Sequence, residues 1–191
     1  MGTEKGLNLL NSEGNGFRRF TTRSRNGGTI SSDHITAILE DKNGRIWVGT
    51  ESGLNLFQPE DRTFRRFHRD SSLAGRTGQT AVTAIYEDAY GRLWVGRRDG
   101  VEIFNVEIGT FTPFDVRLPG GGSPIITGIQ EDSQRILWIG TLNHGMASFN
   151  QVTGQIRWHQ NDPDVPFSLS SNAVRTLFLD GTGGLWVGCH G

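Results

Sequence analysis

The sequence predicts an all-β protein, a β-propeller built from four-stranded antiparallel blades. The first observation is a repeated unit: ITAILEDKNGRIWVGT at residues 35–50 returns in related form at 82–97, 126–141 and 174–189. The second is the position of its tryptophans, which lie 47, 44 and 48 residues apart at Trp47, Trp94, Trp138 and Trp186. The third is that short apolar runs alternate with Gly-containing turns, whereas no long segment shows the 3.6-residue period of a helix. A repeat of this length and pattern is typical of propeller blades.

Each repeat is expected to contain four strands, A to D, and the copy at residues 35–67 serves as the model. Its strands are predicted at 35–40, 45–49, 54–58 and 63–67, each near the usual length of a strand. Two further copies occupy residues 82–114 and 126–159. Residues 3–20 align without a gap with residues 50–67, so they supply strands C and D of a blade whose strands A and B lie at 174–188. Residues 1–191 are therefore expected to form a single propeller region with four repeats.

The link between strands A and B is predicted to be a tight turn that begins with an aspartate. The carboxylate at the start of such a turn accepts backbone N–H groups, and a glycine supplies the positive φ that closes it. The aspartates are Asp41, Asp88, Asp132 and Asp180, and the first two turns close with Gly44 and Gly91. Arg135 replaces the glycine in the third copy, which costs about 1 kcal/mol if the left-handed conformation is kept. That turn is expected to differ from the others.

The four strand B tryptophans are predicted to be buried between the faces of neighbouring sheets. One large ring at the same position of every repeat is what layered packing produces, and each ring can bury roughly 150 to 250 Å². An aromatic cage for a ligand is the alternative role for these rings. Trp158 is different, because the other repeats have Arg19, Arg66 and Pro113 at its strand D position. It is expected to be an exposed residue or a contact residue.

The repeated motif resembles the two-component regulator propeller repeat. The motif reads I-x-x-I-x-E-D-x-x-G-x-I/L-W-V-G-T, followed by GLNLF and a later T-x-F-x-x-F. It is carried by Ile35, Ile38, Glu40, Asp41, Gly44 and residues 47–50, 53–57 and 64–67. The segment at 162–172, with its two prolines, also looks like this family, so the resemblance covers nearly the whole chain.

The resemblance implies a sensor. In that family such repeats build the extracytoplasmic half of bacterial hybrid histidine kinases and related receptors, many of which respond to glycan fragments. It implies that this chain is a portion of a larger propeller, since family sensors carry more repeats, and that it is periplasmic as part of an inner-membrane receptor. It implies no kinase module here, because no Gly-rich ATP-binding motif is present and all five histidines fall in or beside predicted loops.

Composition limits the partners. With 19 basic and 20 acidic residues the net charge is −1, so no general attraction to nucleic acid is expected. No run approaches the ~20 apolar residues of a membrane span, so contact with a membrane is expected only through the parent receptor. The single cysteine, Cys189, leaves the redox compartment open. No cofactor is expected, and no metal, because the histidines belong to different blades without close spacing.

No residue pattern for catalysis is found, so the chain is expected to be non-catalytic. Neither a Ser/His/Asp order, an H-E-x-x-H motif nor a phosphate loop occurs in the sequence. The preferred hypothesis is a ligand-binding sensor. A protein-interaction scaffold is the alternative, and a propeller enzyme such as a glycan lyase is the third.

Candidate ligand-binding residues lie in the connections that follow strand B, which differ between repeats while the strands stay alike. In an antiparallel A-B-C-D meander these B–C connections emerge on the same face as the D–A connections, and loops on a rigid scaffold often carry binding groups. Arg97 and Arg98 suit a carboxylate or sugar hydroxyls, Asn143 and His144 suit neutral polar groups, and Trp158 suits stacking on a sugar face. His190 lies in the last such connection. The expected ligand is small and polar, such as an oligosaccharide.

The ends of the chain are expected to stay apart. Propellers of larger rings have a smaller angle per blade than a four-bladed ring needs, which favours an open arc of three complete blades flanked by half-blades. The unpaired half-blades would then contact remaining blades or a second copy of the chain, and two copies would make a ring of eight.

Overall fold

The computed structural model describes residues 2–23, 28–69 and 80–191, and within these residues every regular element is a β-strand. No helix in this part of the chain is long and apolar enough to cross a membrane. The strands form three complete antiparallel sheets of four strands and two partial sheets. The all-β propeller fold predicted from the sequence is confirmed.

The three complete sheets are called blades 1 to 3. Blade 1 contains β4 (Ile35–Glu40), β5 (Ile46–Thr50), β6 (Gly53–Gln58) and β7 (Thr63–Phe67). Blade 2 contains β8 (Val82–Glu87), β9 (Leu93–Arg97), β10 (Gly100–Asn105) and β11 (Thr110–Phe114). Blade 3 contains β12 (Ile126–Glu131), β13 (Ile136–Thr141), β14 (Met146–Asn150) and β15 (Ile156–His159).

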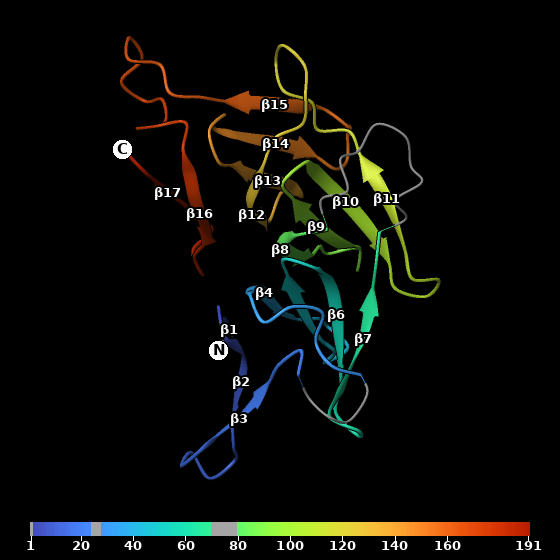
Figure 1. Cartoon of the computed structure of the whole chain (residues 1–191). Coiled ribbons are helices and arrows are strands. Elements are labelled where there is room, and N and C mark those ends of the chain that lie inside the picture. The colour runs from blue at the N-terminus through green and yellow to red at the C-terminus, as the bar shows by residue number, and fades with distance from the viewer. Residues whose placement is uncertain (1, 24–27, 70–79) are drawn as a thin grey trace.

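Two partial sheets flank these blades. At the N-terminal end lie β1 (Gly2–Thr3), β2 (Gly6–Leu10) and β3 (Phe17–Phe20), and at the C-terminal end lie β16 (Val174–Leu179) and β17 (Leu185–Cys189). Both ends of the chain are on the same side of the arc (Figure 1). The two partial sheets do not pair with each other, so the described residues form an open arc.

The first strand of each blade lies on the inner side of the arc. Strand β8 contacts both β4 and β12, and β12 also contacts β16, whereas β7, β11 and β15 lie on the outer side (Figure 1). In all four inner hairpins the register shifts by one residue near the start of the first strand, as in the step from Ile35 to Ala37. Such a β-bulge leaves one residue out of the ladder and redirects its side chain. The bulged residues are Thr36, Thr83, Thr127 and Arg175.

A recurrent aspartate joins each inner turn to the tryptophan that follows it. In blade 1, Asp41 Oδ1 accepts the backbone N–H groups of Asn43 and Arg45, both at 3.0 Å, and Oδ2 accepts the indole N–H of Trp47 at 2.8 Å. Burial acts to raise the pKa of Asp41, but the hydrogen bonds from Trp47, Arg45 and Asn43 outweigh it and hold that pKa below its usual value. Corresponding indole bonds of 2.8, 2.9 and 2.6 Å join Asp88 to Trp94, Asp132 to Trp138 and Asp180 to Trp186.

The turn at Arg135 keeps the conformation of the others, so the expectation that it differs is wrong. Arg135 adopts a φ of 65°, close to the 74° of Gly44. Asp132 Oδ1 still accepts the N–H groups of Gln134 and Ile136, at 2.9 and 3.0 Å. These bonds, together with the indole bond, hold the turn despite the left-handed residue.

Burial of the strand B tryptophans falls toward the C-terminal end. Trp47 and Trp94 are fully buried, as predicted, and Trp138 is half-buried. Trp186 is 65% exposed, so its predicted burial between sheets is wrong for this chain. The reason is geometric: each ring is covered by the next blade, the blade after Trp138 has only two strands, and no described sheet follows Trp186.

Neighbouring blades approach closely at the glycine of each W-V-G or W-I-G sequence. A Cβ on Gly49, Gly96 or Gly140 would lie 2.7, 2.6 or 2.9 Å from the first residue of the next inner strand. Those residues are the β-branched Val82, Ile126 and Val174. Glycine is therefore required at this point by the packing of one blade on the next.

Replacing Gly96 by alanine is expected to lower the free energy of unfolding by about 1 to 3 kcal/mol, the usual effect of overpacking. The new methyl would lie 2.6 Å from Ile126 Cγ2 and 3.1 Å from Ala84 Cβ. Urea denaturation measures the change. Gly181→Ala is the control, because a Cβ there meets no atom within 4 Å, and no loss is expected. Equal losses in the two variants would contradict this account of the contact.

Candidate functional site

The B–C and D–A connections meet on one face of the arc. In blades 1 and 3 and in the C-terminal hairpin, the residue after strand B donates its backbone N–H to the carbonyl of the residue before strand A. These bonds join Glu51 to His34 at 3.3 Å, Leu142 to Ile125 at 3.0 Å and His190 to Ala173 at 2.9 Å. The two sets of connections therefore form one continuous rim, which is the face proposed from the sequence for ligand contact.

A hollow of about 600 Å³ lies at this rim, where the inner strands of all three blades and of the C-terminal hairpin begin. Its polar lining comes from the bulged residues and from two residues of the connections. These six are Thr36, Thr83, Thr127, Arg175, His34 and Arg98. Such a volume is within the usual range for a small-molecule pocket.

The three bulged threonines that line this hollow differ in the hydrogen bonding of their hydroxyl groups. Thr36 Oγ1 donates a hydrogen bond of 2.5 Å to Val82 O of the next blade. The hydroxyl oxygens of Thr83 and Thr127 are buried and have no hydrogen-bond partner among the described residues. A buried hydroxyl without a partner is uncommon in proteins because it loses its hydration without compensation.

Positive charge exceeds negative charge around the hollow. Glu51 Oε1 lies 3.2 Å from Arg98 Nη2 and 3.3 Å from His34 Nδ1, so one carboxylate serves both groups. Arg175 is exposed and forms no ion pair with the described part of the chain. Two guanidinium groups and an imidazole thus face a single carboxylate.

Of the six candidate residues taken from the sequence, only Arg98 lines the hollow. Its neighbour Arg97 is 1% exposed and donates to Glu102 Oε2 at 2.5 Å and to Thr80 O at 2.7 Å. Burial holds the pKa of Arg97 below its usual value, although the adjacent Glu102 acts to raise it. The expectation that Arg97 offers its guanidinium to a ligand at the surface is therefore corrected: it belongs to a buried ion-pair network.

The remaining candidates lie elsewhere on the rim or beside it. Asn143, His144 and His190 are exposed in the connections that follow β13 and β17, outside the lining of the hollow. Trp158 is half-buried, packs against the core of blades 2 and 3, and donates its indole N–H to Arg117 O at 3.0 Å. Of the two roles expected for Trp158, its packing fits that of a contact residue and not that of an exposed residue.

The sequence reasoning missed the bulged residues, above all Arg175. A signal was present in the repeat, since this slot reads Thr, Thr, Thr and then Arg at residues 36, 83, 127 and 175. The β-bulge that turns the slot toward the hollow has no such signal. In the described ranges, no group of three or more His, Cys, Asp or Glu residues is placed to hold a metal ion.

Comparison with a protein family gives a match to each inner hairpin. The family described as "Two component regulator propeller" matches residues 29–52, 78–96, 120–143 and 168–191. The similar protein Histidine kinase P4 of Formosa agariphila is 32% identical over 59 residues, which are 31% of this chain and 4% of that protein.

Two solved structures show the same fold at low identity. The extracellular domain of BT4673 from B. thetaiotaomicron, described as a hybrid two-component system, matches with a TM-score of 0.85 and 22% identity over 98% of this chain. Virginiamycin B lyase from Staphylococcus aureus matches with a TM-score of 0.68 and 12% identity over 96% of this chain. This chain covers 24% of the first structure and 56% of the second.

The family matches coincide with the parts of the fold that recur most strictly. Each matched segment contains the aspartate and the tryptophan of one inner hairpin and the glycine of its W-V-G or W-I-G sequence. In the first three segments this glycine lies at a blade contact. Four segments of the chain therefore match the two-component regulator propeller repeat.

Proposed function

We propose that this chain is a non-catalytic, ligand-binding part of the extracytoplasmic sensor of a bacterial two-component receptor. The observation that carries the proposal is the hollow, which is lined by corresponding positions of four successive repeats. Similarity to Histidine kinase P4 and to the extracellular domain of BT4673 supports the receptor context. This chain covers only 4% of the first protein and 24% of the second structure. That the parent receptor has a membrane anchor and an output module is therefore part of the proposal.

The expected ligand is a small polar molecule, such as an oligosaccharide, bound at the rim of the B–C and D–A connections. The hollow has hydroxyl, guanidinium and imidazole groups for hydrogen bonds. Ile125 and Leu142 add apolar surface in the same lining, suited to the C–H face of a sugar ring. This mixture of a few polar groups with apolar surface is typical of small-molecule sites.

A thermal-shift screen of the chain against neutral and acidic oligosaccharides tests the proposal. A ligand that stabilises the chain is expected to bind about tenfold more weakly to Arg98→Ala, because a hydrogen bond to a charged group is lost. Asn43→Ala, on the opposite turns, is the control and should bind unchanged. Binding that depends on Asn43 and not on Arg98 would count decisively against this face.

A protein-interaction scaffold is the second candidate, favoured by one observation. Phe178 and Trp186 of the C-terminal hairpin are 60% and 65% exposed, a large apolar area for a surface. Capture of a protein partner by this hairpin, without any small ligand in the screen, would favour the scaffold. Since a lyase shares the fold, the same screen should follow turnover of each oligosaccharide, and turnover would make the chain an enzyme.

A further inference from the structure

The bulged slot changes character in the last repeat, and the change introduces charge. The first three repeats place a threonine there, and the fourth places Arg175. The inner strands lie side by side, and the hydroxyl of Thr36 already reaches the backbone of the next blade. The four slots therefore form a row along the inner side of the arc, with hydroxyls first and a guanidinium at its end.

The electrostatic balance of this row favours an anion. Arg98 and His34 share the carboxylate of Glu51, whereas Arg175 has no ion-pair partner in the described ranges. The charges of the two arginines and Glu51 sum to +1. Attraction between charges is stronger in a hollow than on an open surface, because part of the screening water is displaced.

The uncharged part of the row favours hydroxyl groups. The Thr83 and Thr127 hydroxyls are buried without partners, and a hydroxyl both donates and accepts. A ligand with hydroxyl groups beside a charge would pair with them once rotation about χ1 turns each hydroxyl out into the hollow, and these two hydroxyls would lose no existing hydrogen bond in that rotation.

We infer that the hollow binds an acidic saccharide, and that Arg175 is the residue that selects its charged group. This inference rests on the proposed function and narrows its ligand class. A guanidinium presents two parallel N–H donors, which match the two oxygens of a carboxylate or a sulfate group. The side chains of Thr83 and Thr127, which line the same hollow, then lie beside the neutral part of the sugar.

Titration calorimetry of the 191-residue chain with digalacturonate, neutral galactobiose and inorganic sulfate tests the inference. Digalacturonate should bind more tightly than galactobiose. Sulfate alone should bind weakly, because it lacks the sugar hydroxyls. Arg175→Thr, which places in the fourth repeat the residue of the other three, is expected to weaken digalacturonate binding about tenfold or more and to leave galactobiose unchanged.

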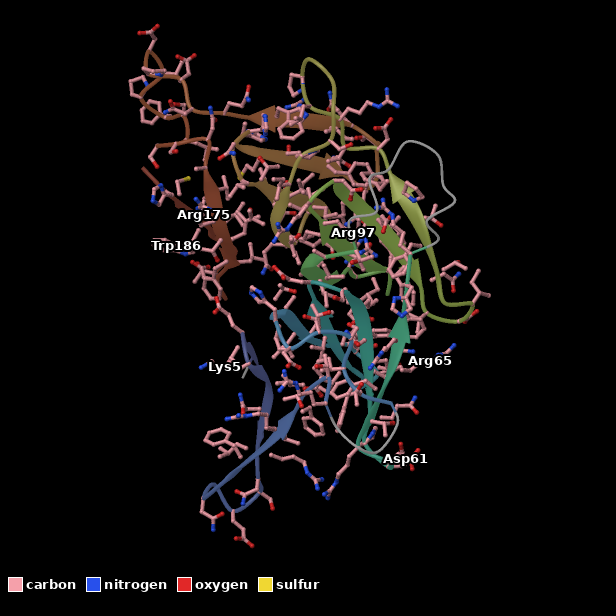
Figure 2. All side chains as sticks on the ribbon, in the orientation of Figure 1. Lys5, Asp61, Arg65, Arg97, Arg175 and Trp186 are labelled. Atoms are coloured by element: carbon pink, nitrogen blue, oxygen red, sulfur yellow. The ribbon has the colours of Figure 1, made fainter. Side chains whose placement is uncertain are left out.

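Arg65→Thr is the matched control for loss of one positive charge. Arg65 lies on β7 at the outer side of the arc, on the far side from Arg175 of β16 (Figure 2). The Arg65→Thr variant should bind digalacturonate as the natural chain does. Both Arg65→Thr and Arg175→Thr should keep the melting temperature of the natural chain.

Four results would overturn the inference. Galactobiose bound as tightly as digalacturonate would remove the charge selection and leave a neutral-ligand sensor, so the proposed function would survive. An unchanged affinity of Arg175→Thr for digalacturonate would exclude Arg175, and an equal loss in Arg65→Thr would reduce the effect to net charge. Absence of binding by both saccharides would refute the acidic ligand class, while the wider oligosaccharide screen would still decide on the sensor.

Discussion

Replacing Trp94 by alanine is expected to lower the free energy of unfolding by about 3 to 5 kcal/mol, the range for a fully buried aromatic side chain. The ring lies between blades 2 and 3, where it contacts Phe114 edge-on at 4.9 Å between centroids and Phe149 at 6.2 Å. Its removal would open a cavity between two sheets. It would also leave Asp88 Oδ2, which accepts the indole N–H at 2.8 Å, with Arg92 alone.

Trp186 and Trp158 provide the comparison, and chemical denaturation of the three variants measures it. Trp186 makes the same hydrogen bond to its aspartate but is 65% exposed, so Trp186→Ala should cost much less. Trp158→Ala should also cost less, since that ring is only half-buried. If all three changes were equally destabilising, coverage by the next blade would not be the source of stability.

The strands could be predicted from the sequence because their signals are local. For blade 1, strands were expected at 35–40, 45–49, 54–58 and 63–67, and they lie at 35–40, 46–50, 53–58 and 63–67. Period-two apolar residues and the aspartate turns are sufficient for this agreement. The burial of Trp186 was not predictable in the same way, because the repeat makes all four tryptophans equal and only the arrangement of the sheets distinguishes them.

The candidate site was less predictable for two physical reasons. Arg97 and Arg98 are adjacent in the sequence, but Arg97 is the last residue of β9 and is buried, whereas Arg98 lies in the connection that follows and lines the hollow. Inside the protein, Arg97 forms an ion pair with Glu102 of the next strand, β10. Arg175 faces the hollow because of a β-bulge, a feature of strand pairing that a single repeat sequence does not encode.

The buried ion-pair network around Glu102 gives the second large prediction. Glu102 is fully buried, and its Oε2 lies 2.5 Å from Arg97 Nε. Its Oε1 lies 2.8 Å from Arg69 Nε, but the N–H of Arg69 is not aligned for a hydrogen bond. Arg69 also pairs with Asp99 at 2.7 Å, which joins the end of blade 1 to blade 2. Two arginines thus depend on two carboxylates away from solvent.

Glu102→Gln is expected to lower the free energy of unfolding by about 3 to 5 kcal/mol, the cost of removing one partner from a buried ion pair. The amide keeps the size of the side chain but leaves the guanidinium of Arg97 buried without its counter-charge. Urea denaturation measures the loss. Glu107→Gln, on an exposed residue of the same blade, should change stability by no more than about 0.5 kcal/mol.

A double variant separates the cost of an unpaired charge from the value of the pair itself. Arg97→Met with Glu102→Leu removes both charges at similar volume, and such replacements are often neutral or stabilising. Blade 1 already has a neutral solution at the corresponding positions, where Thr50 bonds to Ser31 at 2.8 Å and Asn55 bonds to Val48 O at 3.1 Å. Arg69 retains Asp99 in the double variant, so most of the stability lost in Glu102→Gln should return. A double variant as unstable as the single one would show instead that the charges hold blades 1 and 2 together.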